Sequence, residues 1–266
     1  MDNTNDIDNF LLLLKKLKNL NDLETIFTVI DFLYLYDKNK FKFLSKLKLL
    51  NNFIIVKNIL TTISFYPKEN WEDALSQSQI KSKLWLIDEL KKLNLKFDLV
   101  YNLASWYNIL ALFLSEYLNV KKVKSFDKDP NVLNVSDRMI HHRLIDNFNY
   151  KTTIMDIFDI NYSCHNYKTT RCQLDGIIKE FEITNESPDL IINCSCEHLN
   201  YEKWLQLIPK DKIVILQNNN AFNFSDHINC VNNLQEFVTK CDLSEIYYQG
   251  TLHLQNYDRF MIIGTT

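Results

Sequence analysis

From residue 97 to the end of the chain, short apolar runs alternate with longer stretches in which apolar residues recur at helical spacing. Short apolar runs rich in β-branched residues are typical of buried strands, and the stretches between them are long enough to be helices. This alternation predicts a parallel sheet with helices on both faces. The predicted strands are 97–103, 123–126, 152–155, 190–193 and 213–216, and the predicted helices are 106–118, 131–146, 201–207 and 231–240.

The last part of the chain breaks this alternation. Two β-rich runs, 244–254 and 259–264, are separated only by Gln255, Asn256, Tyr257 and Asp258. A parallel crossover needs a dozen residues or more, so these runs must pair as an antiparallel hairpin. We therefore expect a doubly wound α/β domain with a mostly parallel, seven-stranded sheet that ends in a hairpin. The segment 161–185 has no clear periodicity and is interpreted as an insertion, such as a flap or hairpin over the site.

The first 95 residues have a different pattern, in which apolar residues such as Phe10, Leu13 and Leu17 recur at helical spacing. We divide the chain into a helical N-terminal region, 1–95, and a Rossmann-like domain, 96–266. The last predicted N-terminal helix, 82–93, follows a polar turn with serines that suit a helix cap. Gln79 or Lys83 in this turn could also reach the edge of the sheet.

Composition limits the cellular compartment in which the protein is expected. The longest apolar runs fall far short of the ~20 residues that a membrane span needs, and the first nine residues are acidic and polar, unlike a signal peptide. None of the six cysteines forms a CxxC pair. We expect a cytoplasmic protein with reduced thiols and no membrane contact.

The net charge of -3 does not indicate a nucleic-acid partner. A local basic run, from Lys38 to Lys48, is weak evidence for such a polyanion, and a solvated helix face is the more usual explanation of a charge run. The acceptor or other partner cannot be read from the sequence.

Candidate functional residues follow the predicted strands, because ligands of an open parallel sheet bind beyond the carboxyl ends of its strands. Asp127 follows the second strand, 23 residues after Ala104, close to the ~20-residue spacing of nucleotide-binding units. An acidic side chain there can accept hydrogen bonds from both ribose hydroxyls. Asp156 follows the third strand, and the fourth runs from Asp189 into Cys194, Glu197 and His198.

The strand plan, Asp127, Asp156 and the segment from Asp189 to His198 resemble the class I S-adenosylmethionine-dependent methyltransferases. This resemblance implies S-adenosylmethionine as the cofactor. In that reading Asp127 holds the ribose, Asp156 the adenine amino group, and the loop 104–106 the methionine end. The implied cofactor-binding residues are Ala104, Ser105, Trp106, Asp127, Lys128, Asp156, Ile157, Asn193 and Cys194. The family usually has a glycine-rich loop after its first strand, whereas this chain has only three glycines and none there.

Glu197 and His198 are the candidate catalytic residues, because they sit where a transferred group would arrive and either could position or deprotonate an acceptor. Cys194, Cys196 and His198 lack a second ligand pair, so we predict no metal site. The amides of 217–223 suit recognition of a polar acceptor, or simply a turn. Two alternatives remain: transfer of the aminocarboxypropyl group of the same cofactor, and a non-catalytic binding or scaffold protein, which the missing glycines favour.

Overall fold

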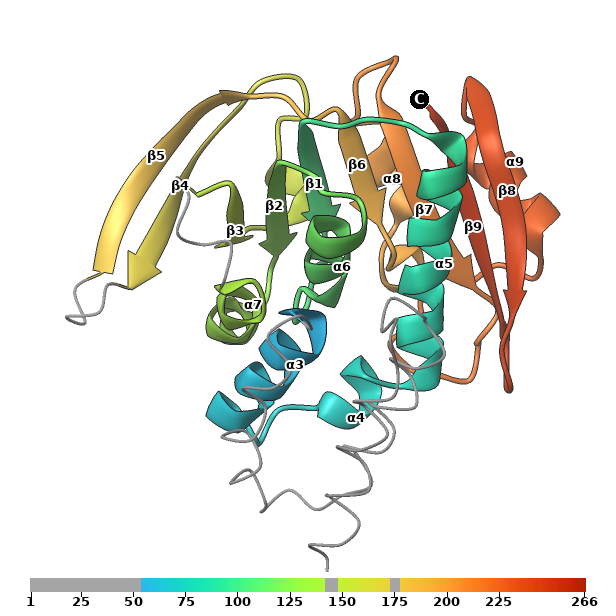
Figure 1. The fold of residues 1–266 in the computed structure, drawn as a ribbon. Coiled ribbons are helices and arrows are strands. Elements are labelled where there is room, and N and C mark those ends of the chain that lie inside the picture. The colour runs from blue at the N-terminus through green and yellow to red at the C-terminus, as the bar shows by residue number, and fades with distance from the viewer. Residues whose placement is uncertain (1–53, 142–147, 173–177) are drawn as a thin grey trace, which may run out of the picture.

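The computed structural model describes residues 54–141, 148–172 and 178–266 (Figure 1). The helices expected before residue 54 and the basic run Lys38 to Lys48 lie outside the described residues. Among the helices that are described, none has the length and apolar character needed to cross a membrane.

The main sheet has seven strands in the order β3-β2-β1-β6-β7-β9-β8. The first five are parallel neighbours, and β9 runs antiparallel to both β7 and β8. Their bounds are β1 Leu99–Leu103, β2 Lys122–Asp127, β3 Tyr150–Ile154, β6 Leu190–Asn193, β7 Ile213–Asn219, β8 Glu245–His253 and β9 Asp258–Thr265. The expected fold class, including the terminal hairpin, is confirmed.

Helices cover both faces of this sheet (Figure 1). One face carries α3 (Ile54–Phe65), α5 (Gln77–Leu93), α6 (Ile109–Tyr117) and α7 (Leu133–Met139), and the other carries α8 (Tyr201–Leu205) and α9 (Leu234–Cys241). Successive strand residues point to opposite faces, so Val100 enters the first core and Tyr101 the second. Short helices α4 (Trp71–Ala74), η2 (Pro130–Val132), η4 (Ile157–Asp159) and η5 (Cys196–His198) complete the connections.

The described N-terminal helices belong to the first of these cores. Leu84 and Ile87 of α5 are buried in the same cluster as Val100 of β1 and Leu110 of α6. Trp85 Nε1 also donates a hydrogen bond to Tyr248 Oη on β8, at 2.9 Å. The change of secondary structure near residue 95 therefore does not separate two cores.

A two-stranded hairpin, β4 (His165–Cys172) and β5 (Ile178–Glu186), stands between β3 and β6 in place of a crossover helix. It packs on the second core, where the His165 and Tyr167 rings contact Phe126. Glu186 accepts hydrogen bonds from Tyr167 Oη at 2.9 Å and Tyr101 Oη at 3.4 Å. These contacts hold the hairpin against the face of the sheet.

Candidate functional site

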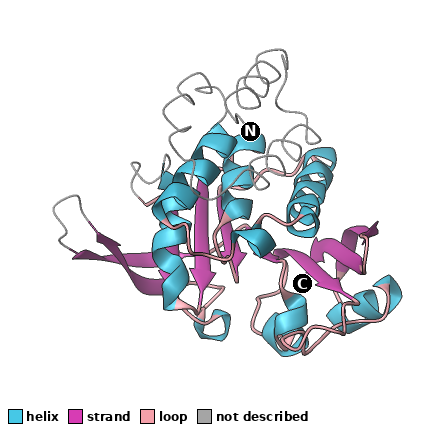
Figure 2. Cartoon of the chain, turned by 90° about the horizontal axis from the view of Figure 1, so that it is seen from below, coloured by secondary structure: helices cyan, strands magenta, loops and turns pink. Residues whose placement is uncertain are grey.

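A pocket of about 650 Å³ lies at the carboxyl edge of the parallel strands. Figure 2 views the molecule from this side. The loops after β1, β2, β3 and β6 form its walls with α4 and the first turns of α5. No described residue of the β4–β5 hairpin lines it, so the described part of the hairpin does not form the cover over the site that the sequence suggested. The predicted residues that do line the pocket are Ala104, Ser105, Trp106, Asp127, Lys128, Asp156, Ile157, Cys194, Glu197 and His198.

The loop after β1 has a backbone conformation that glycine adopts most easily. Ala104, Trp106 and Asn108 have φ angles of 46°, 45° and 64°. A left-handed conformation costs a residue with a Cβ about 1–2 kcal/mol. The loop thus has the alternating left-handed geometry of a glycine-rich turn without containing a glycine.

Asn108 ties this loop to three strands. Its Oδ1 accepts from Asn102 Nδ2 at 3.0 Å and from Ser125 Oγ at 2.7 Å. Its Nδ2 donates to Thr152 Oγ1 at 3.1 Å. Asn108 is fully buried, and asparagine tolerates left-handed backbone better than most residues, so the side-chain bonds offset the strain at this position.

Asp127 holds the loop from the end of β2. Its Oδ2 accepts from the backbone N–H of Trp106 at 2.8 Å, and its Oδ1 from that of Asp129 at 3.1 Å. Burial raises the pKa of this carboxyl above the usual aspartate range, and the two backbone bonds oppose the rise. Each carboxylate oxygen has a second lone pair, so Asp127 can still accept hydrogen bonds from a ligand in the pocket.

The backbone amides of the loop are largely used within the protein. Ser105 N–H donates to the Phe126 carbonyl at 3.2 Å, and Trp106 N–H donates to Asp127. Neither amide is therefore free to donate to the methionine end of a cofactor. The Ser105 hydroxyl, by contrast, is buried and has no hydrogen-bond partner among the described residues.

The ends of β3 and β6 place the remaining predicted cofactor residues. Asp156 caps η4 by accepting from Phe158 N–H at 3.0 Å, and Ile157 is buried beside it. Asn193 is fully buried and accepts from Ser195 N–H at 3.0 Å, so its side chain does not line the pocket. Lys128 is exposed at the rim.

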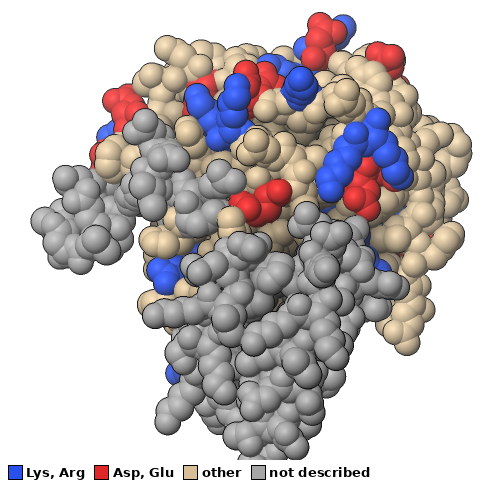
Figure 3. Space-filling model, viewed as in Figure 1, with Lys and Arg blue, Asp and Glu red and all other residues tan. Residues whose placement is uncertain are grey.

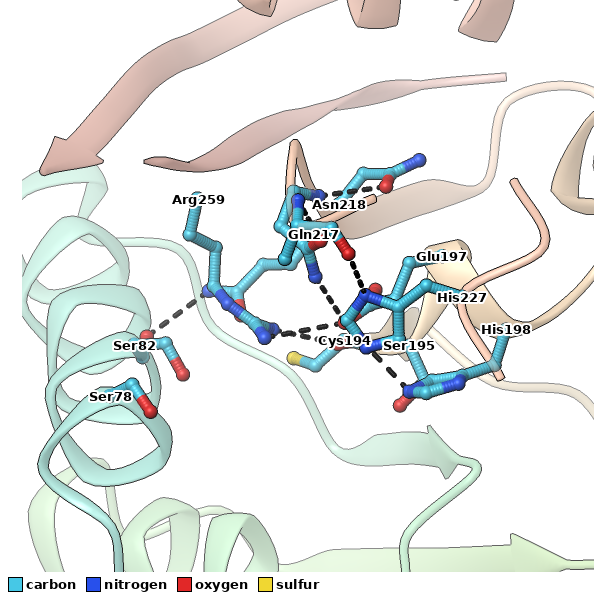
Figure 4. Close-up of polar contacts among 12 residues, drawn as sticks. Ser78, Ser82, Cys194, Ser195, Glu197, His198, Gln217, Asn218, His227 and Arg259 are labelled. Carbon is cyan, nitrogen blue, oxygen red and sulfur yellow. Dashed lines mark hydrogen bonds and ion pairs between the residues drawn. The ribbon is translucent and has the colours of Figure 1, made fainter. Parts of the chain in front are cut away.

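A buried ion pair lies beneath the opposite wall. Glu197 Oε1 accepts from Asn219 Nδ2 at 2.7 Å and from Arg259 Nη2 at 3.3 Å, and both charged side chains are only 3% exposed (Figure 4). Arg259 also donates to the Cys194 carbonyl at 3.2 Å. Sequence reasoning missed Arg259, whose only signal was a charge at the start of an apolar strand.

Lys83 and Cys194 complete this wall. Burial lowers the pKa of Lys83 to about 8, and its Nζ donates to Gln79 Oε1 at 2.6 Å. Burial raises the pKa of the Cys194 thiol to about 11, which keeps it protonated at neutral pH. A serine caps α5, as expected, but the helix begins at Gln77 rather than at Ser82, so the predicted polar turn is its first part; both Gln79 and Lys83 reach the pocket.

The amides expected in a loop after the fifth strand belong partly to the strand itself. β7 extends to Asn219, and Gln217, Asn218 and Asn219 are fully buried. Gln217 donates to the Ser82 carbonyl and Asn218 to the Asn229 carbonyl, at 3.1 and 3.0 Å. The expectation that these three amides recognise an acceptor is wrong, because their side chains are buried and none of them lines the pocket.

Two histidines lie at the far end of the pocket. His198 comes from η5 and His227 from the loop after β7, and their rings meet edge to face with centroids 4.7 Å apart. The sequence singled out His198 from its place after the fourth strand. His227 follows its strand by several residues, and only the folded loop brings it back to the site.

No protein-family model matches the sequence, and no curated protein does. Solved structures do match. The N-methyltransferase NodS from Bradyrhizobium japonicum, in complex with S-adenosyl-l-homocysteine, aligns with a TM-score of 0.53 at 8% identity, over 77% of this chain and 97% of NodS. With the strand order above, this match decides the fold.

The chain has the class I methyltransferase fold. Two further matches score lower. Magnesium protoporphyrin IX methyltransferase from Synechocystis PCC 6803, with bound SAM, has a TM-score of 0.49 at 9% identity, over 82% of this chain and 95% of the other. A candidate O-methyltransferase from Nostoc punctiforme has a TM-score of 0.49 at 11% identity, and the chain spans 59% of its length.

Proposed function

We propose that the chain is an S-adenosylmethionine-dependent methyltransferase. The observation that carries the proposal is the loop 104–108, whose left-handed residues and Asp127 contact form a glycine-type turn at the mouth of the pocket. Strained backbone of this kind persists only where the surrounding structure enforces it, and it concentrates at ligand sites. The three left-handed residues of this loop all line the pocket, whereas the other six described non-glycine residues with positive φ lie outside it.

The residues present fit the proposed cofactor. Asp127 offers lone pairs to the ribose hydroxyls, and Asp156 with the apolar Ile157 suits the adenine. The free hydroxyl of Ser105 and the ammonium group of Lys83 line the same pocket and can meet the methionine carboxylate. These two side chains take the place of the loop amides that are used internally.

The chemistry of transfer needs little from the protein beyond placement. S-adenosylmethionine supplies a methyl group on a positively charged sulfur. Glu197 and His198 hold the acceptor at the other end of the pocket, and His198, which is exposed, can take its proton. Cys194 stays a neutral thiol at neutral pH and therefore does not compete as a nucleophile.

One face of the molecule gives no support to a polyanionic acceptor. On the face shown in Figure 3, basic and acidic side chains of the described residues are interspersed and do not gather by sign. A steep fall of activity with salt would indicate phosphate contacts, and insensitivity to salt would favour a neutral acceptor.

Calorimetric titration with S-adenosylmethionine and S-adenosylhomocysteine tests the proposal. We expect both to bind, because the pocket residues contact the adenosine and amino acid parts that the two molecules share. If neither molecule binds at millimolar concentration, the proposed function is overturned. Mass spectrometry of the spent cofactor then separates the two reactions: S-adenosylhomocysteine marks methyl transfer, and methylthioadenosine marks aminocarboxypropyl transfer.

A further inference from the structure

Three side chains at the far end of the pocket converge on one point. One carboxylate oxygen of Glu197 and one ring nitrogen each of His198 and His227 lie within 4.8 Å of one another. Figure 4 shows the two imidazoles gathered on one side of the Glu197 carboxylate, while Arg259 approaches it from the other. All three residues line the pocket.

The hydrogen bonds of the two histidines orient both rings in the same sense. His227 Nδ1 lies 3.0 Å from the Ala221 carbonyl, and His198 Nδ1 lies 3.1 Å from the Asp226 carbonyl and 3.3 Å from its carboxylate. These partners only accept, so Nδ1 carries the proton in each neutral ring and Nε2 keeps its lone pair. A histidine bound to a metal through Nε2 has the same arrangement.

Glu197 supplies an oxygen without a partner. Its side chain is 3% exposed, and Asn219 and Arg259 both bind Oε1. Oε2 is buried and has no hydrogen-bond partner among the described residues. An unpaired buried carboxylate oxygen is unfavourable, which favours a ligand at this carboxylate, whose other oxygen, Oε1, lies 4.0 Å from His198 Nε2.

We propose that Glu197, His198 and His227 bind a divalent transition-metal ion. Two imidazoles and one carboxylate suit zinc, cobalt or iron, and three protein ligands leave coordination positions open, as in catalytic metal sites. All three ligands line the pocket, so an ion held by them would be reachable from it. Sequence reasoning predicted no metal because it considered Cys194 and Cys196 with His198, and Cys196 is fully buried away from the pocket.

The role of the ion rests on the proposed methyl transfer. A bound metal lowers the pKa of an oxygen that coordinates it and fixes that oxygen in place. The acceptor would then be a hydroxyl-bearing molecule whose oxygen binds the ion, loses its proton to solvent, and faces the methyl donor.

Cobalt titration of the full-length, chelator-treated protein tests the site without any cofactor. We expect one Co²⁺ per chain, with visible absorption bands of a nitrogen- and oxygen-ligated ion. His227→Ala should weaken binding by about 100-fold or more, since loss of an outer-shell partner alone costs 10–100-fold. His253→Ala is the matched control: His253 also pairs with a carboxylate, Asp258, at 2.7 Å, but lies outside the pocket.

Circular dichroism of the metal-free proteins checks that His227→Ala remains folded. Absence of stoichiometric Co²⁺ binding to the wild type, or equal binding by wild type and His227→Ala, would overturn the metal site. Binding of S-adenosylhomocysteine to the metal-free wild type is measured separately. If S-adenosylhomocysteine does not bind, the proposed methyltransferase function is overturned and the result for the metal site still stands.

Discussion

Each oxygen of the Asp127 carboxylate already accepts one backbone hydrogen bond, from Trp106 or Asp129. The residue therefore shapes the loop as well as presenting its remaining lone pairs to the pocket. This double use explains how one acidic side chain can hold a turn that has no glycine. It also means that a substitution must preserve shape to test ligand contact.

Asp127→Asn keeps the size of the side chain and removes its charge. We expect the affinity for S-adenosylhomocysteine to fall about tenfold or more, because a charge-assisted hydrogen bond to the ribose is lost. Asp98→Asn is the control, since Asp98 is an exposed aspartate that pairs with Lys121 at the other end of β1. Calorimetry measures both variants. Equal affinities for wild type and Asp127→Asn would remove Asp127 from the ligand site.

The raised pKa of Asp127 predicts a pH dependence of binding. The carboxylate is the form that accepts hydrogen bonds, and it is lost as the pH falls through its pKa. Burial raises that pKa, so affinity should begin to fall at a higher pH than for an exposed aspartate. Titrations across the acid range should show this loss in the wild type and not in Asp127→Asn, and identical profiles would contradict it.

At the scale of elements, the loop between β1 and α6 stores strain. Ala104→Gly should leave the fold intact and raise the free energy of unfolding by up to about 1 kcal/mol, because glycine adopts a positive φ without a Cβ penalty. Ala111→Gly, inside α6, is the matched control and should lower it by about 1 kcal/mol or more. Urea denaturation measures both changes. A destabilised Ala104→Gly would show that the alanine methyl makes a contact that outweighs the strain.

The strands were predictable from sequence because each carries a short buried apolar run. β6 lies at 190–193 as predicted, and the four-residue connection correctly required a hairpin of β8 and β9. The end of β7 was not predictable, because the polar residues Gln217 to Asn219 continue the strand through internal hydrogen bonds. The strands of the β4–β5 hairpin were not predicted, because the sequence of this segment shows only that helical periodicity is absent.

The site was predictable only where its residues directly follow a strand. Asp127, Asp156 and Glu197 do so, and all reach the pocket. Arg259 reaches the pocket from the terminal hairpin and His227 from a long loop. Neither directly follows a parallel strand, so their positions in the sequence do not identify them as site residues. The scarcity of glycine also misled the sequence-based interpretation of the loop after β1. The chain keeps a glycine at position 264, where a Cβ would lie 2.2 Å from the Glu245 carbonyl oxygen, whereas the loop after β1 forms its turn without any glycine.

At the scale of the whole molecule, α5 joins the N-terminal region to the sheet through a shared core. Ile87→Ala should lower the free energy of unfolding by about 2–5 kcal/mol and shift one cooperative transition, because Ile87 is 1% exposed. Ile228→Ala, at a residue 72% exposed, should change it by less than about 0.5 kcal/mol. Denaturation followed by circular dichroism measures both. A separate early transition in Ile87→Ala would indicate that α5 unfolds independently of the sheet.

The left-handed residue Trp106 has one more consequence. Its indole stacks on Tyr107, with ring centroids 4.7 Å apart, and its backbone N–H is held by Asp127 at the pocket. A glycine at this position would be spectroscopically silent, whereas an indole emits light whose colour and intensity depend on its surroundings. The chain thus carries an intrinsic fluorophore at the pocket, and Trp106→Phe gives the emission of the other three tryptophans, which is subtracted to obtain the signal of Trp106.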